Sequence, residues 1–156
     1  MTPSVLHLHL AINHSPLYAE LFAFVLLVTA LVKRNRTLGT AALVVAIIAA
    51  FCAGAAFYTG DGAAATIDKS PPIPGVDKTM IKEHDLAAGF MLTAACITGG
   101  LALISLIVGW RRGERLRWLD VLIAVAILWS VSVAGRTAFL GGRIHHPEVR
   151  AVSSSQ

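Results

Sequence analysis

Histidine is the residue type in this chain best suited to hold a transition metal or to carry protons, because its imidazole titrates near pH 7 and is a common metal ligand. The six histidines lie in three short segments of the 156-residue chain. They are His7, His9 and His14 in LHLHLAINHSP, His84 in EHDLA, and His145 and His146 in RIHHPE. Segments so far apart in sequence form one site only if the fold brings them together. Whether the histidines share a site therefore depends on the arrangement of the secondary-structure elements around them.

The composition predicts a membrane protein. Hydrophobic residues make up 56% of the chain and charged residues 14%, and the mean hydropathy is +0.70. A soluble domain of this length needs more charge to cover its surface. Cys52 and Cys96 lie inside apolar runs and are expected to be core residues. The chain has no CxxC, no CxxCH, no Walker loop and no dinucleotide-binding glycine fingerprint. Its net charge of +4 does not indicate nucleic acid, because the basic residues gather at the ends of apolar runs.

Four apolar stretches predict an all-α integral membrane protein with four transmembrane helices in one domain. Their expected bounds are about 16–33, 37–59, 82–110 and 117–141, with a Gly/Pro-rich external loop over 60–81. Each stretch is about long enough to cross a ~30 Å hydrocarbon core at ~1.5 Å per residue. The short first and third connections favour an antiparallel four-helix bundle.

The two short turns set the expected orientation. KRNRTLG and RRGERLR hold seven of the thirteen lysines and arginines, and basic residues near helix ends favour the cytoplasmic side. Both termini and the 60–81 loop should then lie on the external, periplasmic side of a bacterial inner membrane. All six histidines fall at that external face, an asymmetry that hydropathy does not require.

His14 and His84 are the ligand pair that this topology favours. The first and third helices of a sequential bundle lie diagonally across its core. His14 precedes the first helix and His84 opens the third, so the two side chains could face each other. Two such imidazoles can ligate a haem iron from both sides. Arg136 or Arg143 would then be the cationic partner of the haem propionates.

Two other interpretations remain open. A mixed site for copper, zinc or iron would use His14, His84, His146 and Glu83. Interfacial histidines can also be amphipathic residues at headgroup depth, which is the interpretation favoured for His7 and His9. His14 differs from these two, because Ser15 as the N-cap and Pro16 after it would fix its direction.

Glu20 and Arg136 place charges inside the expected spans, where an unpaired charge is costly. They lie at similar depth on neighbouring helices, so one prediction is an ion pair between them. Alternatively, Arg136 holds an anionic cofactor group, and Glu20 accepts protons or hydrogen-bonds a ligand imidazole. Asp120, near the cytoplasmic end of the last helix, is expected to pair with Arg117 or with another residue of the basic turn.

The segments INHSPL, TGDGA, EHDLA and RTAFLGGRIHHPE, in this order along almost the whole chain, resemble those of a bacterial family of four-helix membrane proteins of unknown function. The matched positions are His14, Glu83, His84, Gly141, Gly142, His146, Pro147 and Glu148. Ser15 and His145 stand where that family often has phenylalanine and arginine, so His145 adds a candidate ligand and removes a propionate partner. Such proteins look like relatives of membrane-embedded b-type cytochromes, and similar segments occur fused to cytochrome c domains. The resemblance implies electron transfer at the external face.

Three functions follow as expectations. The first is a membrane redox subunit that binds haem b and passes electrons between a quinol or partner subunit and an external acceptor such as a cytochrome c. The second is a copper-, zinc- or iron-binding membrane protein, and the third is a scaffold subunit of a larger respiratory or photosynthetic complex. An electron-transfer or accessory role is favoured over catalysis. In each case the chain lies in the lipid bilayer, and small residues such as Gly99 and Gly100 suit close packing within the bundle or in a homo-oligomer.

Overall fold

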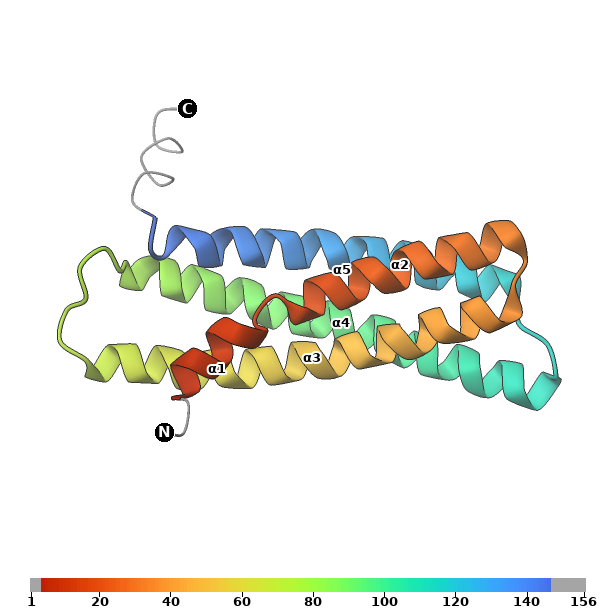
Figure 1. Cartoon of the computed structure of the whole chain (residues 1–156), viewed down its shortest axis with the longest axis horizontal. Coiled ribbons are helices and arrows are strands. Elements are labelled where there is room, and N and C mark those ends of the chain that lie inside the picture. The colour runs from red at the N-terminus through yellow and green to blue at the C-terminus, as the bar shows by residue number, and fades with distance from the viewer. Residues whose placement is uncertain (1–3, 147–156) are drawn as a thin grey trace, which may run out of the picture.

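Five helices follow one another in the computed structural model, which describes residues 4–146 (Figure 1). They are α1 (Val5–Ile12), α2 (Ser15–Lys33), α3 (Arg36–Lys69), α4 (Lys78–Arg112) and α5 (Arg117–Arg143). No strand occurs in this range. The expectation of an all-α chain is confirmed.

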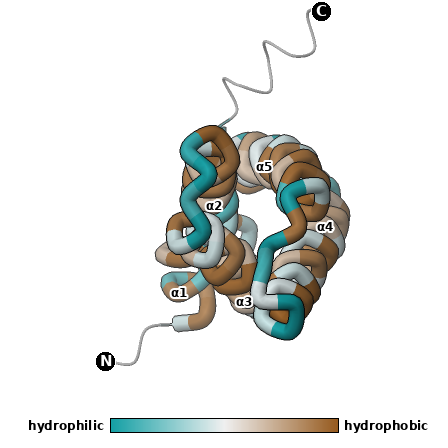
Figure 2. The backbone as a smooth tube through the Cα atoms, turned by 90° about the vertical axis from the view of Figure 1, so that its right-hand side faces the viewer, coloured by the Kyte–Doolittle hydropathy of each residue, from teal (hydrophilic) through white to brown (hydrophobic). Residues whose placement is uncertain are grey.

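The four long helical segments are long and apolar enough to cross a membrane, with α1 and α2 together counting as one segment, Val5–Lys33. Their outward faces carry many large apolar side chains, among them Phe51, Trp110 and Val125. The buried core, in contrast, consists largely of alanines. Because a water-soluble bundle buries its large apolar residues, this inverted pattern is typical of a multi-pass membrane protein. In Figure 2 the hydrophilic segments gather at the end that faces the viewer, where the two short turns lie.

The long helices form a sequential antiparallel bundle. α2 packs against α3 and α5, and α4 packs against the same two helices. The first and third long helices, α2 and α4, are therefore diagonal to each other, as predicted. The short α1 lies across α3 at the end of the bundle opposite the short turns (Figures 1 and 2).

Small residues allow α3 and α4 to approach closely. A Cβ atom added at Gly99 would lie 2.8 Å from the Cβ atom of Ala50, closer than two such atoms pack. Gly100, the next residue, is exposed and has no such neighbour within 4 Å. Gly99 therefore sets the distance between the two helices, whereas Gly100 faces outward.

We expect Gly99→Val to lower the free energy of unfolding by about 1–3 kcal/mol, because the larger side chain forces α3 and α4 apart. Gly100→Val is the matched control and should change it little. Titration of both variants with a denaturing detergent, followed by circular dichroism, measures the difference. Equal losses in the two variants would contradict the assigned packing.

The connection between α3 and α4 is shorter than predicted. The predicted external loop covered 60–81, but α3 continues to Lys69 and α4 begins at Lys78. Gly60 and Gly62 do not end α3, because the alanines after them favour helix and α1 packs on this part of the helix. The helix ends instead at Ser70, just before two prolines, where the backbone becomes extended.

The start of the chain also differs from the prediction. Residues 5–12 form a helix, and the N-cap of α2 is His14 rather than Ser15. The Ser15 hydroxyl donates a hydrogen bond back to the carbonyl of Ile12, at 2.7 Å. Because the preceding segment is itself helical, the carbonyl of Ile12 is available as an acceptor, and the Ser15 hydroxyl binds it instead of capping α2.

Candidate functional site

A cavity of about 340 Å³ opens at the end of the bundle where α1, α3, α4 and α5 meet. Its walls consist mainly of alanines, glycines and aliphatic side chains, and its volume falls in the range of small-molecule and cofactor sites. Its polar lining residues are His9, Asn13, His14, His84, Asp85, Thr137 and His145. The cavity is thus an apolar site with a few imidazoles on its walls.

His9 enters this cavity from α1 and is held by α3. Its Nδ1 lies 3.1 Å from the carbonyl oxygen of Ala56 and 3.3 Å from the hydroxyl oxygen of Thr59. A carbonyl can only accept, so Nδ1 carries the proton in this contact, and in the neutral ring Nε2 carries the lone pair. The ring lies against Gly60, where an added Cβ would be 3.2 Å from the His9 Cε1 atom.

His84 enters from α4 and is held by α5 in the same manner. Its Nδ1 donates to the carbonyl oxygen of Thr137 at 2.9 Å. Its ring lies against Gly141, where an added Cβ would be 3.1 Å from the His84 Cε1 atom. The Thr137 hydroxyl donates to the carbonyls of Val133 and Ala87, so Thr137 also ties α5 to α4.

The two histidines share one mode of attachment. In each case the accepting carbonyl belongs to the residue four positions before the glycine on which the ring lies, Ala56 before Gly60 and Thr137 before Gly141. Residues four apart lie on the same helix face, so one face supplies both the hydrogen-bond acceptor and the space for the ring. Two distant parts of the chain thereby build equivalent imidazole supports.

The two rings lie near each other inside the bundle. Their centroids are 6.4 Å apart, and their planes are inclined by 71°. Each Nδ1 faces its supporting helix, and each Nε2 lies 3.8 Å from the position of a Cβ atom added at the glycine of that helix. The helices that hold the two rings, α3 and α5, are diagonal to each other in the bundle, and both rings line the same cavity. Within residues 4–146 neither Nε2 has a hydrogen-bond partner.

The structure brings His84 to the cavity and gives it a different neighbour from the one that the sequence favoured. His14 also lines the cavity, but it is exposed at the N-cap of α2, with its ring centroid 6.4 Å from that of Tyr18. His9, interpreted from sequence as an interfacial residue, takes the position beside His84. Gly60 in TGDGA and Gly141 in FLGG were the available signal, since each of these two leaves room for a ring.

The predicted mixed metal site is not assembled. Glu83 and His146 are exposed, and across the described range 4–146 no three His, Cys, Asp or Glu side chains form a group that could hold a metal ion. His14, Glu83, His84 and His146 are thus not brought together as one ligand set. Pro147 and Glu148 lie outside the described residues.

The predicted ion pair between Glu20 and Arg136 is wrong. Glu20 is 1% exposed and accepts a hydrogen bond from the Ser130 hydroxyl at 2.6 Å. Arg136 is on the exposed side of α5 and does not line the cavity. The guanidinium of Arg143 lies 5.9 Å from the centre of the Phe139 ring.

Comparison of the chain with protein-family models, with curated proteins and with solved structures gives no match. The assignment of this site therefore depends on its own geometry, and above all on the paired imidazoles of His9 and His84.

Proposed function

We propose that this chain is a membrane electron-transfer protein that binds haem b between His9 and His84. The observation that carries the proposal is the pair of imidazoles, 6.4 Å apart, each with Nδ1 bonded to a backbone carbonyl and, within residues 4–146, with no hydrogen-bond partner at Nε2. Histidines that ligate metals commonly donate the other ring N–H to a carbonyl or carboxylate, which fixes the tautomer and the ring orientation.

The ring separation fits two ligands on opposite sides of one metal ion. A metal–imidazole bond is about 2 Å long and the ring centre lies about 1 Å behind the nitrogen, so the two ring centres would be about 6 Å apart. The separation of His9 and His84 has this value before any ligand is added.

The number of protein ligands favours haem over a bare metal ion. Zinc sites use three or four protein ligands, and residues 4–146 hold no group of three. A haem, whose iron already has four porphyrin nitrogens, would need only one or two further ligands from the protein, and His9 and His84 would provide them. The apolar cavity walls, including Ala53, Met91 and Ala134, suit the faces of a porphyrin.

The residues of the chain then have separate roles. Bound haem would supply a one-electron couple, whose potential would depend on its protein ligands and on the burial of the site. The carbonyls of Ala56 and Thr137 would accept from each Nδ1–H and so orient the two rings, and the alanine-rich walls would form an apolar lining around the bound group. All six histidines are at or beside one end of the bundle, so electron exchange with a quinol, a cytochrome c or a larger complex would occur at that end. The basic turns at the other end favour assigning this end to the periplasmic side of a bacterial inner membrane.

Absorption spectroscopy of the purified protein tests the proposal. After expression in cells that make haem and purification in mild detergent, we expect a Soret band and, on reduction with dithionite, a sharp α-band. Elemental analysis should give iron in the same proportion as haem. A colourless protein that contains copper or zinc, or a colourless protein that co-purifies with a large complex, would support the metal-binding or the scaffold alternative instead.

A valine at Gly141 is expected to lower haem affinity by about 10–100-fold, the range seen when the supports of metal-binding histidines are altered. The added side chain would occupy the space of the His84 ring, since even a Cβ would be 3.1 Å from Cε1. Gly135→Val is the control, because Gly135 is exposed on the same helix and a Cβ there meets nothing within 4 Å. Haem titration of both variants measures the affinities, and equal behaviour would contradict the role given to Gly141.

A further inference from the structure

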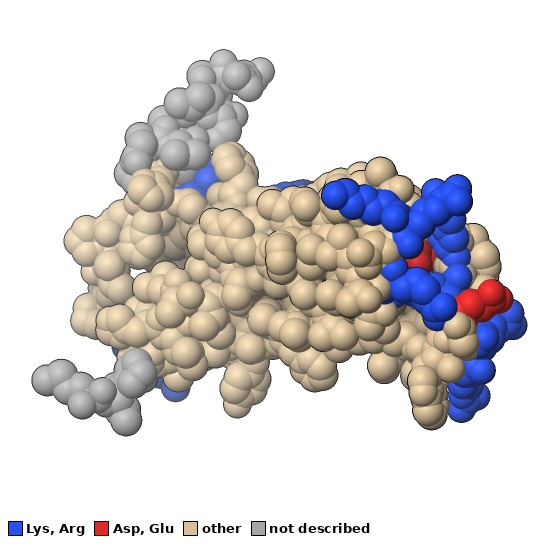
Figure 3. All heavy atoms as spheres, turned by 45° about the vertical axis from the view of Figure 1, so that its right-hand side comes forward, with Lys and Arg blue, Asp and Glu red and all other residues tan. Residues whose placement is uncertain are grey.

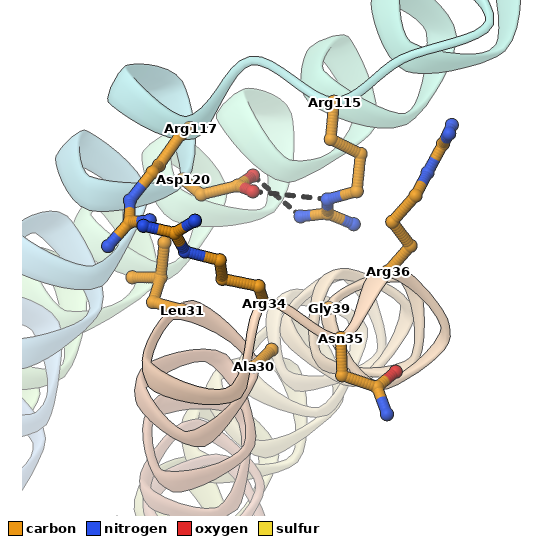
Figure 4. Close-up of a pocket in the computed structure, with 9 residues that line it drawn as sticks. All are labelled: Ala30, Leu31, Arg34, Asn35, Arg36, Gly39, Arg115, Arg117 and Asp120. Atoms are coloured by element: carbon orange, nitrogen blue, oxygen red, sulfur yellow. Dashed lines mark hydrogen bonds and ion pairs between the residues drawn. The ribbon is translucent and has the colours of Figure 1, made fainter.

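A second pocket, of about 410 Å³, lies at the end of the bundle with the two short turns. Lysine and arginine side chains gather at this end (Figure 3). Four arginines, Arg34, Arg36, Arg115 and Arg117, line the pocket together with a single acidic residue, Asp120 (Figure 4). The charged lining therefore has a formal net charge of +3.

Two of these arginines already bind other groups of the chain. Arg115 binds the Asp120 carboxylate through two hydrogen bonds of 2.6 and 3.1 Å, which engage both of its oxygens. Arg36 donates to the carbonyl oxygen of Gly113 at 2.6 Å and so joins the two turns. The only carboxylate in the pocket is thus already paired.

The other two arginines, Arg34 and Arg117, are exposed and have neither a hydrogen bond nor an ion pair from their side chains to any residue in 4–146. In the view of Figure 4 both side chains extend toward the same side of the pocket. Arg34 is itself the residue that ends α2, and its backbone is left-handed, with φ of 51°, a conformation that is unfavourable for residues other than glycine. Among the residues that the structure describes, these two guanidinium groups therefore have no counter-charge.

The surroundings favour an anion at the membrane surface. α3 and α5 both begin beside the pocket, and helix N-termini carry partial positive charge. Ala30 and Leu31, at the end of the apolar α2, form its apolar side. A guanidinium pairs with phosphate through two parallel hydrogen bonds. A phosphate that is attached to acyl chains would match both the cationic and the apolar parts.

We infer that this pocket binds the phosphate group of an anionic phospholipid through Arg34 and Arg117. The two arginines could bind free phosphate in the same way. The apolar side of the pocket and its place at the end of the membrane-spanning helices favour the lipid. This site lies at the opposite end of the bundle from His9 and His84, so it does not depend on the haem proposal.

Native mass spectrometry and thermal unfolding of the full chain in detergent test this inference, with phosphatidylglycerol, phosphatidylcholine and inorganic phosphate as separate additions. We expect retention of phosphatidylglycerol and a raised unfolding midpoint with that lipid alone. Arg34→Gln with Arg117→Gln should lower the affinity for phosphatidylglycerol about 30-fold, because each basic residue near a membrane surface raises the affinity for anionic lipid about fivefold. Arg111→Gln with Arg112→Gln removes the same charge at the end of α4, outside the pocket lining, and should keep the affinity.

Several results would overturn the inference. Equal losses in the two double variants would show a general effect of charge. Equal binding of phosphatidylcholine would exclude recognition of the anion, and equal stabilisation by inorganic phosphate would assign the pocket to a free anion. Circular dichroism checks that each variant is folded. If the pocket variant does not fold, Arg117→Lys replaces it. That change keeps the charge and removes the planar donor pair, so it should weaken phosphatidylglycerol binding, and unchanged binding would contradict the site.

Discussion

Replacing His9 or His84 by alanine is expected to lower haem affinity by at least about 100-fold, because loss of a ligand should cost more than the 10–100-fold measured for loss of its supporting partners. The same change at His14 should leave the affinity nearly unchanged, since His14 is exposed at the start of α2 and its ring lies beside Tyr18. The measurements are the Soret absorbance and the haem content per chain of the three purified variants.

His14 is the matched control for this experiment, because it is a histidine that lines the same cavity without the Nδ1 support of the other two. Free imidazole should restore haem binding to His84→Gly, which separates loss of a ligand from loss of the fold. A large effect at His14 with none at His9 would contradict the site and would return the ligand pair to the one that the sequence favoured.

Replacing Asp120 by alanine is expected to lower the free energy of unfolding by about 3 kcal/mol, the usual cost of breaking a buried ion pair from one side. Asp120 and Arg115 are only 8% and 12% exposed in their side chains, and their closest contact is 2.6 Å. Asp120 also accepts a hydrogen bond from the Ser105 hydroxyl of α4 at 3.3 Å. Without the carboxylate, the Arg115 guanidinium would remain largely buried without a counter-charge.

A double variant distinguishes this cause from a general weakening of the turn. Arg115→Met with Asp120→Leu removes both charges and keeps most of the volume, so it should regain much of the stability lost in Asp120→Ala. Arg111→Gln, at an exposed position, should change the stability little. Denaturing-detergent titration followed by circular dichroism gives all three values, and a double variant no more stable than Asp120→Ala would contradict the pairing.

The four long apolar helices could be predicted from the sequence because a span of the membrane requires a long apolar segment whatever its neighbours are. The ends of the helices could not be predicted in this way, because they depend on contacts with neighbouring elements. Gly60 and Gly62 are typical of a loop, yet α3 continues past them because α1 packs there. Asp120 was predicted to pair with Arg117 or another residue of the basic turn, and its partner is Arg115 of that turn.

The pair of imidazoles at the cavity was only half predictable. His84 follows from its place at the start of α4, but the choice between His9 and His14 depends on how α1 lies across α3, which is a tertiary contact with no local pattern. The failed pairing of Glu20 with Arg136 has a similar cause. Sequence gives the depth of a residue along a helix, whereas the direction of its side chain comes from packing: Ser130, six residues before Arg136, is on the face that meets Glu20.

The central claim is that two imidazoles of this chain ligate one haem iron, and electron paramagnetic resonance of the oxidised protein tests it most directly. Two strong axial ligands from His9 and His84 should give a low-spin ferric signal in the wild-type protein, which becomes high-spin or disappears in His9→Ala. A wild-type protein with a high-spin ferric signal, or with no haem signal at all, would contradict the claim.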